Sequence, residues 1–78
     1  MAKVREFFKT NNSSKIHPTE VECGYQKIAT PTGPLLQLST YGSDSRQSPK
    51  KVSQTLQLDR RVAADLLQII KETFPDLP

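Results

Sequence analysis

Residues 52–74, VSQTLQLDRRVAADLLQIIKETF, contain the change of periodicity that decides the fold. In the part before Asp59, polar and apolar side chains alternate with Val52, Leu56 and Leu58 on one side, which is typical of a half-buried β-strand. After Asp59 the apolar residues follow helical spacing instead. Asp59 itself is a suitable N-cap, because its carboxylate can accept a backbone N–H from the first helical turn. The stretch therefore predicts a strand that leads directly into a C-terminal helix.

The expected helix has a wider apolar side than one sheet requires. It should end before Pro75, because proline restricts the residue before it and cannot continue a helix. Its apolar side chains span about 160° at about 100° per residue, whereas packing on one sheet face needs only about 100°. Either the segment containing Phe7 and Phe8 or the same helix of a second copy would cover the surplus. The apolar arc contains Val62, Ala63, Leu66, Leu67, Ile69, Ile70 and Phe74.

Two further strands are expected before residue 52. Residues 19–29 and 35–41 alternate in polarity, and the sequence Pro31-Thr32-Gly33-Pro34 between them is a strong turn signal. Residues 42–51 form a polar, basic loop that leads to the strand at 52–58. Because consecutive strands with short connections usually pair, the sequence predicts an α+β fold. We expect a three- or four-stranded antiparallel meander packed against one C-terminal amphipathic helix.

The N-terminal residues 1–15 form a separate segment, and residues 16–78 form the single domain. Val4, Phe7 and Phe8 have helical spacing, which predicts one or two helical turns that dock the phenylalanine pair. Asn11-Asn12-Ser13-Ser14 follows as a breaker or a flexible linker. The segment is thus expected to be flexible or to dock, on this chain or on a protein partner.

Size and composition limit the possible functions. With 78 residues the core is thin, and one cysteine and one histidine provide neither an internal disulfide nor a zinc site, so we expect a homodimer. His17 precedes a proline and Cys23 lies in a strand, which argues against a catalytic pair, an enzyme or a bound cofactor. No apolar run reaches the roughly 18 residues of a membrane span, and no export signal is evident, so we expect a cytoplasmic protein.

The face of the expected sheet that is opposite the helix collects neutral hydrogen-bonding side chains. A solvated face of an antiparallel sheet often has this composition. The alternative is a platform for unpaired bases, on which Tyr41 stacks and amides and hydroxyls bind base edges or sugars. The face contains Glu22, Gln26, Gln37, Ser39, Tyr41, Ser53, Thr55 and Gln57.

Basic side chains are expected at both ends of this face, in a chain with a net charge of +3 and a pI of about 9.3. Arg60 and Arg61 stand in the first helical turn, where their charge opposes the helix dipole, and such local conflicts favour a functional role. The candidate nucleic-acid-binding residues are Lys27, Gln37, Ser39, Tyr41, Arg46, Lys50, Lys51, Thr55, Gln57, Arg60 and Arg61.

Residues 35–74, with LLQLSTYGSDSRQSPKKVSQTLQL followed by DRRVAADLLQIIKETF, resemble the positive-cofactor family of transcriptional coactivators. The resemblance covers about half of the chain and is one of element order. It implies a dimer that binds single-stranded DNA along its sheet, although that family usually has four strands and a denser basic and aromatic set. Residues 15–70 also resemble a family of small uncharacterised bacterial proteins with the pattern TYGSDSR…SQTLQLDR.

These features give two expectations for function. The first is a non-enzymatic module that binds single-stranded DNA or RNA on the open polar face of the sheet. The second is a small protein-interaction subunit of a larger bacterial complex, such as a mobile-element or defence system, which binds its partner through Phe7 and Phe8.

Overall fold

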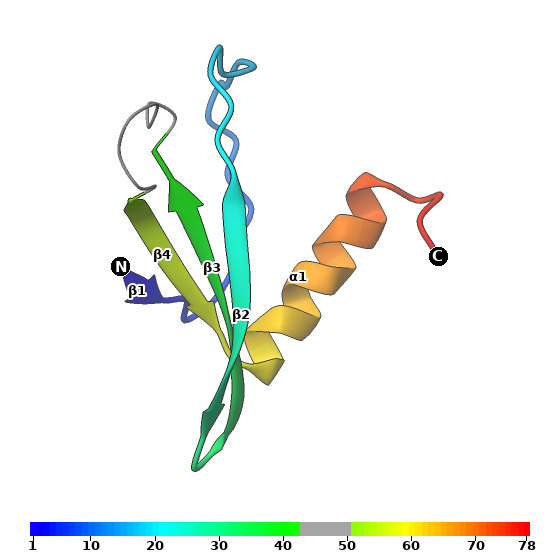
Figure 1. Ribbon diagram of the computed structural model, residues 1–78. Coiled ribbons are helices and arrows are strands. Elements are labelled where there is room, and N and C mark those ends of the chain that lie inside the picture. The colour runs from blue at the N-terminus through cyan, green and yellow to red at the C-terminus, as the bar shows by residue number, and fades with distance from the viewer. Residues whose placement is uncertain (43–50) are drawn as a thin grey trace.

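The computed structural model describes residues 1–42 and 51–78, and it has a four-stranded sheet and one C-terminal helix (Figure 1). The expected α+β fold is confirmed. The elements are β1 (Ala2–Lys3), β2 (Cys23–Thr30), β3 (Gly33–Tyr41), β4 (Val52–Leu58) and α1 (Arg60–Thr73). The sheet order is β1-β4-β3-β2, so β3 and β4 are the inner strands.

The N-terminus forms a strand, and the prediction of helical turns there is wrong. Ala2 and Lys3 pair in parallel with Leu56 and Gln57, and the N–H of Val4 donates to the carbonyl of Gln57 at 2.9 Å. The physical reason is the open edge of β4, whose unpaired backbone groups accept another strand. The sheet is therefore mixed, with one parallel pair beside the antiparallel β2–β3–β4 meander.

The hairpin between β2 and β3 forms where the proline and glycine turn signal predicts it. Gly33 has a φ of 123°, a conformation that glycine adopts without steric cost. The Thr30 hydroxyl bonds to the carbonyl of Gly33 and accepts from the N–H of Thr32 at 3.3 Å. These bonds extend the pairing to Thr30 and Gly33, so both strands reach closer to the turn than expected, while β2 begins later, at Cys23.

A bulge in β4 changes which face two side chains occupy. Thr40 pairs with Gln54 but Tyr41 pairs with Val52, which leaves Ser53 as the extra residue. Ser53 bonds through its hydroxyl to that of Thr40 at 2.9 Å. Val52 therefore shares the face of Tyr41, whereas strict alternation placed Val52 on the apolar face and Ser53 on the polar face.

The helix begins where the sequence predicts. The carboxylate of Asp59 accepts from the N–H of Val62 at 3.0 Å, and the N–H of Phe74 donates to the carbonyl of Ile70 at 2.9 Å. One residue separates β4 from α1, so the helix contacts the sheet only near its first turn and then leaves it (Figure 1). Among the described residues, Leu58 and Val62 are the buried apolar side chains.

The helix covers the apolar face of the sheet only at the end near Leu58 and leaves the rest of that face open. The side chains of this face include Tyr25, Leu36, Leu38, Leu56 and Leu58, which neighbour one another across β2, β3 and β4. Tyr25 remains 74% exposed and Leu56 46% exposed. The residues that follow β1 lie beside the helix instead, where Arg61 donates to the carbonyl of Arg5 at 2.8 Å.

Candidate nucleic-acid interface

Four of the predicted site residues lie together on the polar face of the sheet. Gln37 pairs with Gln57 across β3 and β4, and Ser39 pairs with Thr55 one step further along. Because paired residues project to the same side, their side chains form a compact group. They line a shallow hollow whose rim also includes Met1, Lys3 and Val52. We call this hollow the polar hollow.

Hydrogen bonding fixes the centre of the polar hollow. The amide nitrogen of Gln57 donates to the amide oxygen of Gln37 at 2.9 Å, and both side chains are partly buried. This bond does not use the amide nitrogen of Gln37 or the amide oxygen of Gln57, so the pair retains one donating nitrogen and one accepting oxygen. Ser39 is only 7% exposed, so its hydroxyl forms part of the floor of the hollow.

Tyr41 lies on the same face but leans on β2. A Cβ atom built on Gly24 would stand 3.2 Å from Cε1 of Tyr41 and 3.7 Å from its hydroxyl oxygen. The missing side chain of Gly24 thus gives the ring room to lie against the edge strand. Tyr41 is half-buried, and it extends the polar face from the hollow toward β2.

Arg60 and Arg61 lie near the other end of the polar face, beyond Gln57. They line a second hollow together with Lys3, Asp59 and the hairpin residues from Thr32 to Leu35. Lys3 lines both hollows, and it therefore connects the amide pair with the two arginines. We call this second site the basic hollow.

The remaining basic residues do not all join this surface. Lys51 is exposed and precedes β4, at the end of the sheet away from the basic hollow. Lys27 pairs with Leu36 and therefore projects from the apolar face, where it lines a hollow with Leu58, Arg60 and Ala63. Arg46 and Lys50 lie outside the described residues.

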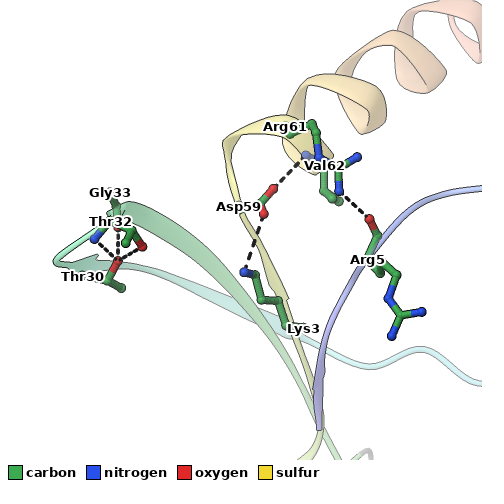
Figure 2. A network of polar contacts seen from close by, with 8 residues as sticks. All are labelled: Lys3, Arg5, Thr30, Thr32, Gly33, Asp59, Arg61 and Val62. Atoms are coloured by element: carbon green, nitrogen blue, oxygen red, sulfur yellow. Dashed lines mark hydrogen bonds and ion pairs between the residues drawn. The ribbon is translucent and has the colours of Figure 1, made fainter.

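The sequence analysis did not identify Lys3 as a site residue. Its strand β1 has only two residues, which is too short to show an alternation of polar and apolar side chains. Its Nζ lies 3.6 Å from Oδ2 of Asp59, whose other oxygen accepts from the N–H of Val62 (Figure 2). The bond from Val62 lowers the pKa of Asp59, and the charges of Lys3 and Arg61 act in the same direction. One carboxylate thus links the N-terminal strand to the start of the helix.

Three further observations on residues 1–42 and 51–78 concern metal ions, nucleophilic side chains and membranes. Within those ranges no group of three or more His, Cys, Asp or Glu side chains is arranged to hold a metal ion. His17 and Cys23 are both exposed, and the thiol of Cys23 contacts the carbonyl of Gly24 at 3.6 Å. None of the helices in the described part of the chain is long and apolar enough to cross a membrane.

Comparisons with family models, curated proteins and solved structures give no match to this chain. The geometry of its own residues therefore carries the functional argument. That geometry is a polar hollow with one amide nitrogen and one amide oxygen that the Gln37–Gln57 bond does not use, connected through Lys3 to a pair of arginines.

Proposed function

We propose that the polar face of the sheet binds single-stranded nucleic acid. The observation that carries the proposal is the position of Lys3, which lines both the polar hollow and the basic hollow. Groups that recognise bases and groups that neutralise phosphates then lie along one continuous surface. This is the combination that binding of a flexible polyanion requires.

Each part of the surface has a distinct chemical role in this proposal. The free nitrogen of Gln37 and the free oxygen of Gln57 bond to base edges or to sugar hydroxyls. Tyr41 offers a ring for base stacking. Lys51 at one end and Arg60 at the other contact phosphates; β4 between them has seven residues, which gives a span of about 20 Å.

Fluorescence anisotropy with labelled oligothymidine and oligouridine tests the proposal, with a duplex of equal length for comparison. We expect tighter binding of the single strands and a linear fall of the logarithm of affinity with the logarithm of salt concentration. Arg60→Gln and Lys51→Gln should each weaken binding and reduce the salt slope by about 0.7, because each removes one phosphate contact.

Lys27→Gln is the matched control, because it makes the same change of charge on the apolar face. It should leave affinity and salt slope nearly unchanged. The proposal fails if micromolar protein binds no oligonucleotide at low salt. It also fails if Lys27→Gln weakens binding as much as Lys51→Gln, since binding would then follow net charge rather than the polar face.

Capture of a protein partner through Phe7 and Phe8 is a second candidate. Both side chains line a hollow with Leu66 and Ile69 of α1, and Phe8 remains largely exposed there. Phe8→Asp should then abolish capture of that partner without changing oligonucleotide affinity. Equal capture by this variant would exclude Phe8 as the contact.

A further inference from the structure

The apolar face of the sheet carries a row of side chains that one copy of the chain leaves open. Tyr25, Leu38 and Leu56 pair in register across three strands, and Ala2 of β1 continues the row. Tyr25 and Leu56 are 74% and 46% exposed. A row of this kind on an inner and an outer strand is normally the floor of a core.

The helix presents a second open apolar surface toward the same side. Ala63 lines a hollow with Lys27, Leu36 and Leu58, so this side of α1 faces the apolar face where the helix joins the sheet. At about 100° per residue, Leu67, Ile70 and Phe74 continue the side of Ala63 along the helix. Leu67 is 54% exposed and Phe74 is 55% exposed, because α1 leaves the sheet beyond its first turn (Figure 1). We call these four residues the apolar side of α1.

The accessible surface area of the chain shows how much more surface one copy exposes than a compact monomer does. The chain exposes 7303 Å², whereas a compact monomer of this mass exposes about 4,800 Å². Its radius of gyration is 14.9 Å, against about 11.5 Å for a compact chain of 78 residues. The excess surface is about 2,500 Å² for each copy.

This excess area is as large as the area that each copy buries in a stable homodimer. Obligate homodimers bury about 2,000–5,000 Å² in total, which is about 1,000–2,500 Å² from each copy. Even if half of the excess belongs to the extended residues 10–22, the remainder of about 1,250 Å² reaches that class. A second copy can also supply the apolar surface that covers this face. The apolar arc of its α1 is wider than the part that contacts its own sheet.

We propose that two copies associate through the apolar side of α1 and the apolar face of the sheet. The helix of each copy packs against Tyr25 and Leu56 of the other, as two-fold symmetry requires. The interface then supplies the core that Leu58 and Val62 alone do not provide. Both polar faces point away from it, so this inference does not depend on nucleic-acid binding.

Sedimentation equilibrium of the full chain from about 1 to 100 µM tests the proposal, and we expect twice the mass of one chain. The double variant Leu67→Glu/Phe74→Glu should shift the mass to that of a single chain, because two carboxylates would otherwise be buried. Gln68→Glu is the control. It adds one carboxylate, where the double variant adds two, on the opposite side of α1, and it should leave the dimer intact.

The wild-type chain provides a second readout if the double variant does not fold. Thermal unfolding of a dimer depends on protein concentration, so the midpoint should rise by several degrees over a hundredfold increase. A single-chain mass at 100 µM would overturn the proposal. So would a dimer that persists in the double variant, or an unfolding midpoint that is independent of concentration.

Discussion

Within one copy, the two faces of the sheet differ in how far their side chains are paired or covered. On the polar face, Gln37 and Gln57 bond to each other and Ser39 is buried. On the apolar face, Tyr25 and Leu56 are open, and the helix covers only the end near Leu58. The side chains that prefer water are thus ordered and partly shielded, while many that avoid water are exposed.

This difference bears on the partners that we propose for the two faces. The amide pair across the inner strands stabilises the sheet and also leaves hydrogen-bonding groups for a polar ligand. An apolar face without a partner costs about 25 cal/mol for each Å² left in water. The proposed polar ligand would use the polar face, and the proposed second copy would cover the apolar face. Four experiments test this contrast, from the largest expected effect to the smallest.

Leu58→Ala should destabilise the protein most, by about 2–5 kcal/mol, because Leu58 is one of two buried apolar residues in the described chain. Urea denaturation followed by circular dichroism measures the change. Leu56→Ala is the informative partner, since Leu56 is half exposed in one copy. A cost above about 1 kcal/mol for Leu56→Ala supports a covered apolar face, because exposed substitutions usually stay within about 0.5 kcal/mol. A smaller cost for Leu58→Ala than for Leu56→Ala would contradict the core described here.

Gln37→Ala should cost about 1 kcal/mol, because it leaves the partly buried amide of Gln57 without its acceptor. The double variant Gln37→Leu/Gln57→Leu removes both polar groups, and it should be close to neutral in stability. It should nevertheless weaken oligonucleotide binding. A double variant that costs as much stability as Gln37→Ala, yet binds oligonucleotide as tightly as wild type, would mean that the bond stabilises the fold and does not serve recognition.

Much of this contrast was predictable from sequence, and the reasons for the failures are specific. Alternation placed Gln37, Ser39, Thr55 and Gln57 on one face because β3 and most of β4 are regular. The Asp59 cap was predictable because capping is a local interaction.

The features that could not be predicted from the sequence, β1 and the bulge in β4, depend on pairing between strands. The pairing of β1 with β4 depends on residues 54 positions apart, and two residues show no period. The bulge at Ser53 depends on the partner strand, so it reversed the faces of two residues without a local signal. Lys27 follows the regular alternation of β2, which puts it on the apolar face opposite Leu36.

Asp59 joins the two faces, because it binds Lys3 of the polar side and caps the helix that starts over the apolar side. The native-state pKa of Asp59 is lowered from 3.8, mainly by the bond from Val62. Its contribution to stability is therefore full above the unfolded-state pKa, and it is lost as pH falls through the lower native-state value. Asp59→Asn keeps an acceptor for Val62 but has no charge to lose.

Wild type should thus be more stable than Asp59→Asn at neutral pH, and the difference should shrink below about pH 4. Urea midpoints measured at several pH values report it. A difference that stays constant with pH would show that the charge of Asp59 contributes nothing.

Gly24→Ala should have the smallest effect on stability, within about 0.5 kcal/mol. The added Cβ would stand 3.2 Å from Cε1 of Tyr41, so the ring must shift by a few tenths of an ångström. Alanine opposes this cost by reducing the freedom of the unfolded chain. The ring resonances of Tyr41 in NMR spectra report the shift directly.

If Tyr41 stacks on a base, Gly24→Ala should lower oligonucleotide affinity by a larger factor than it changes the folding equilibrium constant, because stacking depends on the position of the ring. Unchanged affinity together with shifted Tyr41 resonances would remove Tyr41 from the interface and leave the amide pair and the basic residues as its contacts.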